Sequence, residues 1–246
     1  MSLTSSSDIY SAVHEEGINL IIRHIMLQRP SLFNYGTSLI VNNSRLLCEP
    51  IEVAPGITTL ITEMDPLPVV GTYGVGLNYC FQITDMETDF HPGSVFTLPP
   101  ELNPPLSSQE FAFRVRTCVG MGCPPRGYLK EVDLPPEYLV PFERLPQTGE
   151  ERERPRDLPP IVLPTRELEC FCIELFITGT SDIVGPVGSQ EIRIALEEPE
   201  IVDIKPMGME NSMECYMNTV IQLVVIPRVN KAITKILFET IDLGDL

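Results

Sequence analysis

Residues 75–83 read V-G-L-N-Y-C-F-Q-I, and this stretch decides the fold class. Apolar side chains at the odd positions alternate with Gly76, Asn78, Cys80 and Gln82 at the even positions. A period of two predicts a β-strand with one apolar face and one face of small or polar residues. We expect the odd-numbered face to be the one that the rest of the protein covers.

The same alternation returns at residues 111–117 and at every second position from Phe171 to Ile177. Long alternating strands are typical of an antiparallel sheet that covers something apolar with one face. Shorter strands are expected at residues 38–41, 46–53, 57–64, 190–196, 200–205 and 235–243.

Two helices are expected to accompany the sheet. The first covers residues 8–28, begins after a serine N-cap and ends before Pro30. Residues 18–27 are apolar nearly all round, so this helix should be buried on most sides. The second covers residues 212–226 and ends at Pro227. The fold class is therefore α+β, with a long, coiled antiparallel sheet packed on an N-terminal amphipathic helix and a second, C-terminal helix.

We expect one β-rich domain over residues 1–246, which is long enough for an ample core. Within it, residues 133–165 are rich in proline around the charged run 150–154. Proline donates no backbone hydrogen bond and favours extended chain. This segment therefore reads as an extended, charged insertion.

The formal net charge of −17 disfavours nucleic acid and anionic headgroups as partners. No window offers the roughly 18 apolar residues that cross a bilayer, and the first residues lack the pattern of a signal peptide. The seven cysteines are odd in number and irregularly spaced, which is a poor disulfide framework. We expect a soluble, cytoplasmic protein with reduced thiols, while release by a route without a signal peptide stays open.

Two close cysteine pairs are the candidate metal ligands. Cys118 and Cys123 flank a glycine-rich turn, and Cys170 and Cys172 share one face of a strand. Four thiolates could hold zinc, although neither spacing is the common one of zinc knuckles. The alternative is that Cys170 and Cys172 are small buried apolar residues. We expect no cofactor.

The sequence offers little material for catalysis. It contains three histidines, and no convergent set of histidine, cysteine and acid is evident. The acids Asp85, Glu87 and Asp89 with His91 could hold a hard cation, but a solvated strand face explains them as well. We therefore expect a protein that is not an enzyme.

The order of helix, long strands and second helix resembles the tubular lipid-binding (TULIP) proteins. The resemblance rests on the helix at residues 8–28, the strands at 75–83 and 111–117, and the helix at 212–226. It implies a curved sheet around a long helix that together hold an apolar, lipid-like ligand. The candidate ligand contacts are Leu20, Ile21, Ile25, Phe81, Phe113, Phe171, Ile173 and Leu175. An ordinary packed core explains the same residues, because burying each stabilises the fold by about 1.5–3 kcal/mol.

The alternative function is that of a structural or assembly subunit of a larger particle. Proline-rich extended arms and the acidic charge suit a chain that docks on protein partners or on copies of itself. The partner would then be a protein rather than an apolar small molecule or lipid.

Overall fold

A computed structural model describes residues 14–69, 71–102, 104–125, 128, 134–139, 158–184, 191–205, 226–227 and 229–231. The predicted α+β class is confirmed: a large sheet rich in antiparallel pairs is accompanied by few helices, and the N-terminal helix packs on it. Most of the predicted C-terminal helix lies outside the described residues. Residues 226–227 and 229–231 are helical, so helical structure continues beyond its expected end at Pro227.

The chain forms two compact units. Unit 1 comprises Met1–Ile25, Asp85–Arg116 and Ile173–Leu246, and unit 2 comprises Met26–Thr84 and Thr117–Cys172. Three long strands contribute residues to both units. The single domain over residues 1–246 stays a prediction.

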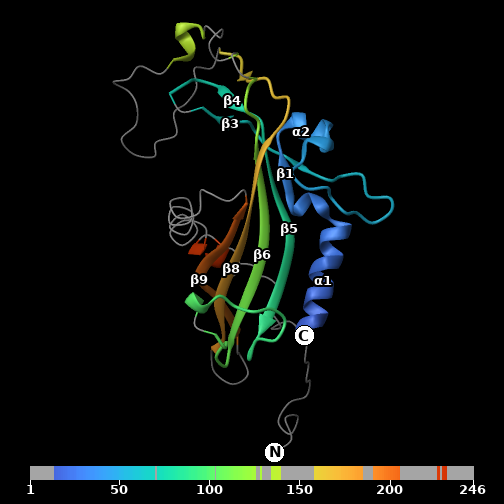
Figure 1. Cartoon of the computed structure of the whole chain (residues 1–246), viewed down its shortest axis with the longest axis vertical. Helices are drawn as coiled ribbons and strands as arrows, with labels where there is room; N and C mark the ends of the chain where they lie inside the picture. Colours follow the sequence, from blue (N-terminus) through green and yellow to red (C-terminus); the bar gives the residue numbers. More distant parts are fainter. Residues whose placement is uncertain are drawn as a thin grey trace, which may run out of the picture. The chain divides into compact units, whose positions relative to one another are not determined.

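The main sheet has six strands in the order β2-β1-β5-β6-β8-β9 (Figure 1). They are β1 (Asn34–Gly36), β2 (Thr62–Glu63), β5 (Tyr79–Phe90), β6 (Glu110–Met121), β8 (Glu169–Val184) and β9 (Glu191–Lys205). Strand β1 runs antiparallel to β5 with Tyr35 opposite Phe81, and parallel to β2. The long strands expected from the alternating sequence are thus present and neighbour one another.

Strand β9 joins the two strands predicted at residues 190–196 and 200–205 across Pro199. Pro199 lies inside this strand although proline cannot donate a hydrogen bond to a ladder. In the described sheet β9 is the outermost strand, where a missing backbone donor is tolerated.

A second sheet lies within unit 2 and contains β3 (Leu67–Pro68), β4 (Val75–Leu77) and β7 (Ile161–Val162). Asn78 separates β4 from β5. Its buried side chain accepts a hydrogen bond from Thr37 Oγ1 at 2.8 Å and donates one to Thr165 Oγ1 at 3.0 Å. The predicted strand at 75–83 therefore divides between two sheets.

The ends of the predicted insertion at residues 133–165 belong to the core of unit 2. Helix η4 (Pro136–Tyr138) and the segment around β7 place Tyr138 and Leu163 in one buried cluster with Val75. Residues 140–157 lie outside the described residues, so the extended tip stays a prediction.

Three of the predicted short strands are wrong in whole or part. Residues 38–41 lie in helix α2 (Ser38–Asn42), and residues 46–53 contain no strand. Residues 57–64 contribute only β2. A short apolar run has no periodicity that separates helix from strand. The remaining short helices are η1 (Pro30–Leu32), η2 (Ser44–Leu46) and η3 (Pro100–Leu102).

Helix α1 (Glu15–Gln28) attaches to β5 through polar side chains. Asn19 Nδ2 donates to Thr88 O at 2.8 Å, and Asn19 Oδ1 accepts from Thr88 N at 2.7 Å. Glu15 Oε2 accepts from Phe90 N at 3.1 Å. The asparagine amide thus satisfies the backbone of β5 as a neighbouring strand would.

An asparagine side chain also binds the backbone of β9, the strand at the other edge of the described sheet. Asn230 Oδ1 accepts from Leu196 N at 2.8 Å, and Asn230 Nδ2 donates to Leu196 O at 2.9 Å, so an asparagine caps the backbone of β9. Both caps lie in unit 1. They hydrogen-bond backbone N–H and C=O groups of β5 and β9 that could otherwise pair with a strand of another chain.

Candidate functional site

In unit 2 the covered face of β5 is the polar one. Cys80 and Gln82 are 0% and 1% exposed, whereas Tyr79, Phe81 and Ile83 are half-buried. The expectation that the odd-numbered apolar face would be the covered one is wrong here.

Hydrogen bonds explain why the polar face can be buried. Gln82 Nε2 donates to Asn34 Oδ1 at 3.1 Å and to Glu49 O at 2.9 Å, and Gln82 Oε1 accepts from Glu49 N at 3.0 Å. A buried amide with its partners in place costs little. Cys80 is small enough to pack among Ile40 and Ile61.

The opposite side of these strands carries the candidate apolar pocket. It has a volume of about 370 Å³. Its lining consists of Tyr35, Met64, Leu67, Tyr79, Phe81, Val119 and Met121. The ring centroids of Tyr35 and Phe81 are 6.2 Å apart. The volume is at the small end of the range for ligand sites.

The described lining of this pocket includes two tyrosines, Tyr35 and Tyr79. Burial, together with the negative charge of Asp65, raises the pKa of Tyr79 above its ordinary value near 10. The Tyr35 hydroxyl donates to Leu32 O at 2.8 Å. The described lining contains no charged side chain, so recognition there would rest on shape and apolar contact.

The sequence-predicted ligand contacts on the strands are divided between the units. Phe81 lines the apolar pocket, and Phe171 is half-buried in unit 2. Ile173 and Leu175 are buried in unit 1, where Phe113 is half-buried with its ring 5.4 Å from that of Phe111. Only Phe81 of these lines a described pocket.

The three predicted ligand contacts on α1 are exposed residues. Leu20 and Ile21 are each 57% exposed and Ile25 is 38% exposed, and no residue of α1 is buried. The prediction that this helix is buried on most sides is wrong, because Glu15 and Asn19 make its contacts to β5. Leu20, Ile21 and Ile25 form an exposed apolar stripe, named here the α1 stripe.

Pocket residues beyond Phe81 were missed from the sequence. The alternation predicted at residues 111–117 continues in β6 through Val119 and Met121, so following that pattern further along the sequence finds both residues. Tyr35, Met64 and Leu67 come from short elements without periodicity, and the sequence holds no signal for them.

Unit 1 has a larger groove of about 750 Å³. Apolar side chains that include Leu98, Phe176 and Ile201 line it together with charged residues. Arg114 Nη2 lies 2.6 Å from Glu87 Oε2, and its guanidinium lies 5.6 Å from the Phe96 ring centroid. Arg114 also approaches Asp85 and Glu174 at 3.7 and 4.0 Å. Arg114 therefore forms salt bridges that stabilise the fold, and its side chain also lines the groove.

The acids predicted as a cation site or solvated face have structural partners. Asp89 is fully buried and accepts backbone hydrogen bonds from Ser94, Val95 and Phe96 at 3.0, 3.0 and 3.2 Å. Its carboxylate thus fixes the loop after β5. His91 Nδ1 lies 2.6 Å from Leu106 O.

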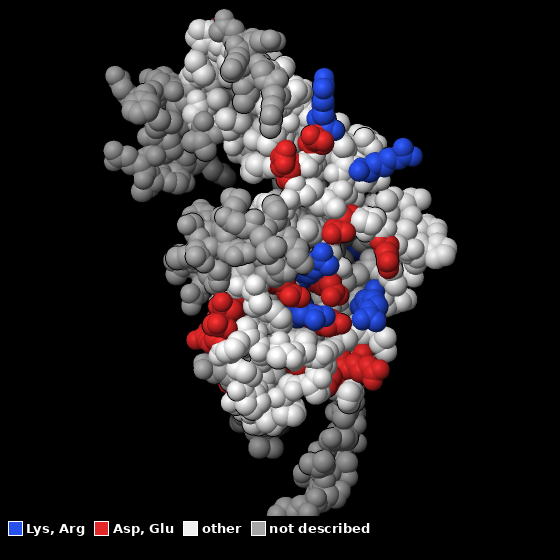
Figure 2. All heavy atoms as spheres, in the orientation of Figure 1, with Lys and Arg blue, Asp and Glu red and all other residues white. Residues whose placement is uncertain are grey.

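Figure 2 shows basic and acidic side chains interleaved on the face in view. On that face the described residues form no continuous basic patch.

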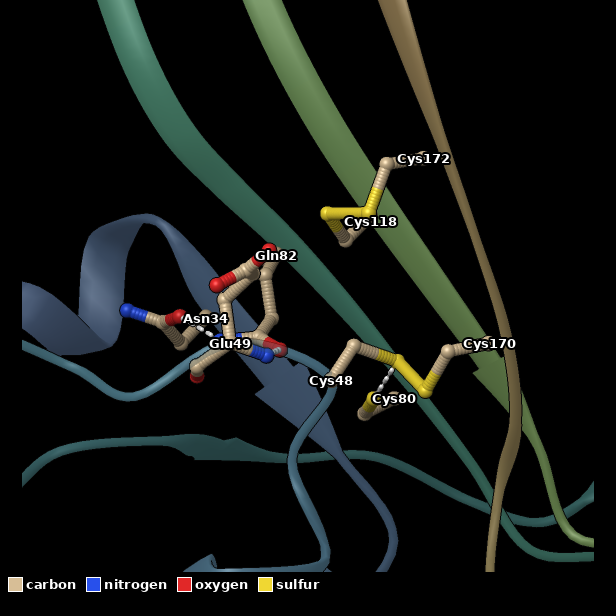
Figure 3. The surroundings of a disulfide bond; sticks show 8 residues. All are labelled: Asn34, Cys48, Glu49, Cys80, Gln82, Cys118, Cys170 and Cys172. Carbon is tan, nitrogen blue, oxygen red and sulfur yellow. Dashed lines mark hydrogen bonds between the residues drawn. A yellow bond between two sulfur atoms is a disulfide. The ribbon is translucent and has the colours of Figure 1, made fainter. Parts of the chain in front are cut away.

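Four of the six described cysteines form disulfides, Cys48–Cys170 and Cys118–Cys172 (Figure 3). The predicted pairs Cys118/Cys123 and Cys170/Cys172 therefore do not form a four-thiolate zinc site. Cys170 is exposed and Cys172 half-buried, so neither is a small buried apolar residue. The Glu49 carboxylate lies within 4.8 Å of the Cys118 and Cys172 sulfurs, which are bonded to each other and are not thiolates.

The expectation of reduced thiols is wrong for these four cysteines. The cytoplasmic location rested partly on it and loses that support, since disulfides persist mainly in oxidising compartments. It stays a prediction. None of the described helices combines the length and apolar character that a membrane crossing needs.

Comparison of the chain with protein-family models, with curated proteins and with solved structures finds no match.

Proposed function

We propose that this protein is a non-catalytic binding protein that holds an apolar, lipid-like ligand against the odd-numbered face of its sheet in unit 2. One observation carries the proposal: the apolar side chains of β5 and β6 line an open pocket, while the polar side of β5 is the buried one. Met64 and Leu67 at this pocket are 42% and 38% exposed.

The physical argument is that exposed apolar surface gains free energy when covered. Each Å² removed from water contributes about 25 cal/mol. A contiguous apolar pocket on a folded chain marks a ligand or partner site more often than chance exposure does. The absence of charged residues from the described lining favours a ligand that is apolar where it contacts the protein. A resemblance to the TULIP proteins would imply the same ligand class.

The test is an equilibrium titration with a fluorescent fatty-acid analogue, and the chain has no tryptophan whose emission could overlap with that of the probe. Wild-type protein should bind the probe. Val119→Glu should weaken binding by about tenfold or more, because a carboxylate in the apolar pocket must be desolvated. Met121→Gln, a milder change in the same lining, should weaken it in the same direction.

Two controls make the result specific. Val184→Glu introduces the same charge at a position that is 37% exposed and outside both pockets, and should bind like wild type. Val202→Glu places it in the unit 1 groove. Loss of binding in Val202→Glu with retention in Val119→Glu would move the ligand to that groove and overturn the proposal.

The alternative function, an assembly subunit, is favoured by the α1 stripe. Its exposed Leu20, Ile21 and Ile25 form an apolar surface that could dock on a partner. A defined multimer in solution that Ile21→Lys dissociates would support this function. A monomer whose mass Ile21→Lys leaves unchanged would count against self-assembly through the stripe.

A further inference from the structure

Three sulfur atoms lie together beneath the covered face of β5, and we name Cys48, Cys80 and Cys170 the sulfur cluster. Cys48 and Cys170 form a disulfide, and the free thiol of Cys80 lies 3.7 Å from Cys48 Sγ. Figure 3 shows Cys80 beside the Cys48 end of that bond. A thiol in contact with one sulfur of a disulfide is the reactant pair of thiol–disulfide exchange.

The residues around the sulfur cluster are closely packed, above all at Gly120 of β6. A Cβ at Gly120 would lie 2.6 Å from Cys48 Sγ and 3.0 Å from Cys80 Sγ, so only glycine at this place of β6 lets the sulfurs approach. Cys80 is 0% exposed and packs with Ile40 and Ile61. External thiols and oxidants therefore have poor access to Cys80, whereas the Cys48 sulfur is within its reach.

We propose that Cys80 exchanges with the Cys48–Cys170 disulfide and thereby transfers a reactive thiol to the exposed Cys170. The Cys80 thiolate attacks Cys48 Sγ, and a Cys48–Cys80 bond forms. The Cys48–Cys170 bond breaks, its electron pair leaves on Cys170 Sγ, and that sulfur takes up a proton. One disulfide and one thiol are present before and after, so no oxidant or reductant is consumed.

Exposure gives the exchange its direction. Cys170 is an exposed residue, so water can solvate the departing thiolate, and a well-solvated leaving group departs faster. The product carries its free thiol at the surface, where it can form a mixed disulfide with a soluble disulfide or react with an electrophile. Cys170 would then be a modification site that the Cys48–Cys170 bond conceals.

Burial keeps the reaction slow at neutral pH. It raises the pKa of the Cys80 thiol, and hydrogen bonding by the backbone at Cys48 and Gly120 opposes this in part. The Glu49 carboxylate lies within 4.8 Å of the Cys118 and Cys172 sulfurs, at the second disulfide of unit 2. The thiolate fraction, and with it the exchange rate, should rise about tenfold per pH unit below that pKa.

The experiment uses the full chain with Cys123→Ser and Cys215→Ser, so that Cys80 is its single free thiol. The folded protein is incubated with N-ethylmaleimide at about pH 7 and about pH 8, a pH step that multiplies the thiolate about tenfold. It is then quenched, digested in acid to stop scrambling, and mapped by mass. The expected products are maleimide on Cys170 and a Cys48–Cys80 disulfide, formed about tenfold faster at the higher pH.

The matched control adds Cys80→Ser, which keeps the size of the side chain and removes the nucleophile. It should retain Cys48–Cys170 and take up no label. Three results would overturn the proposal: label on Cys80 with Cys48–Cys170 intact, no label over a time in which the unfolded chain reacts fully, or equal labelling of Cys170 in the Cys80→Ser control.

Discussion

At the scale of single residues, Asp89 is the clearest case of a polar side chain that the fold requires. It is fully buried and accepts three backbone hydrogen bonds from the loop after β5. Hydrogen bonds to a charged group contribute about 1.5–3 kcal/mol each and are not additive. Asp89→Ala should therefore lower the free energy of unfolding by about 3 kcal/mol or more.

Asp85→Ala is the matched control for this prediction. Its carboxylate is 50% exposed and lies 3.7 Å from Arg114, and such surface pairs contribute about 1 kcal/mol or less. Urea unfolding of both variants measures the difference. Equal losses would show that Asp89 does not anchor the loop.

Tyr79 reports on the apolar pocket through its ionisation. Burial and then Asp65 raise its pKa above the ordinary value near 10. Because the folded chain holds this proton more tightly, the stability from neutral Tyr79 is present below pH 10 and is lost as the pH rises through the raised pKa.

The difference in tyrosinate absorbance between wild type and Tyr79→Phe isolates this titration. Its midpoint should lie above 10, and an apolar ligand should raise it further by excluding water. A midpoint at or below 10, or one that a bound ligand leaves in place, would remove Tyr79 from the pocket.

How much the sequence could predict is visible in β5. The alternation at Tyr79, Cys80, Phe81 and Gln82 identified the strand and its two faces. It could not identify the covered face, because the partners of Gln82 come from Asn34 and Glu49, which are distant in sequence. Disulfide pairing was out of reach for the same reason, since Cys48 and Cys170 are 122 residues apart.

At the scale of elements, α1 shows how a helix can attach to a sheet without burying its apolar side. Asn19 replaces the backbone partners of Thr88, as Asn230 does for Leu196 on β9. The apolar composition of residues 18–27 predicted a helix correctly and its burial wrongly. Side-chain caps of this kind leave no periodic signal in the sequence.

Substitutions on the two sides of α1 should therefore differ in how much they destabilise the protein. Asn19→Ala leaves Thr88 N and O without their partner and should cost about 1–3 kcal/mol of unfolding free energy. Leu20→Lys, at a residue 57% exposed, should change it by about 0.5 kcal/mol or less. Chemical denaturation compares them, and a larger loss in Leu20→Lys would show that the stripe is packed against the protein.

At the scale of the whole molecule, each unit has its own buried clusters and its own pocket. The apolar pocket of unit 2 carries the proposed function, whereas charged side chains such as Arg114 and Glu174 help to line the unit 1 groove. The sulfur cluster lies on the covered face of unit 2. Ligand binding and thiol exchange are therefore testable separately, since Val119→Glu in β6 and Cys80→Ser in β5 change opposite faces of these neighbouring strands.

Native mass spectrometry of the purified, tag-free chain tests whether the protein carries an apolar ligand. We expect a 27.5 kDa chain with a further mass of about a few hundred daltons, the size of ligand that such a pocket holds. Organic solvent should extract that mass, Val184→Glu should retain it, and Val119→Glu should lose it. Bare chains that also fail to take up an added fatty-acid analogue would contradict the claim.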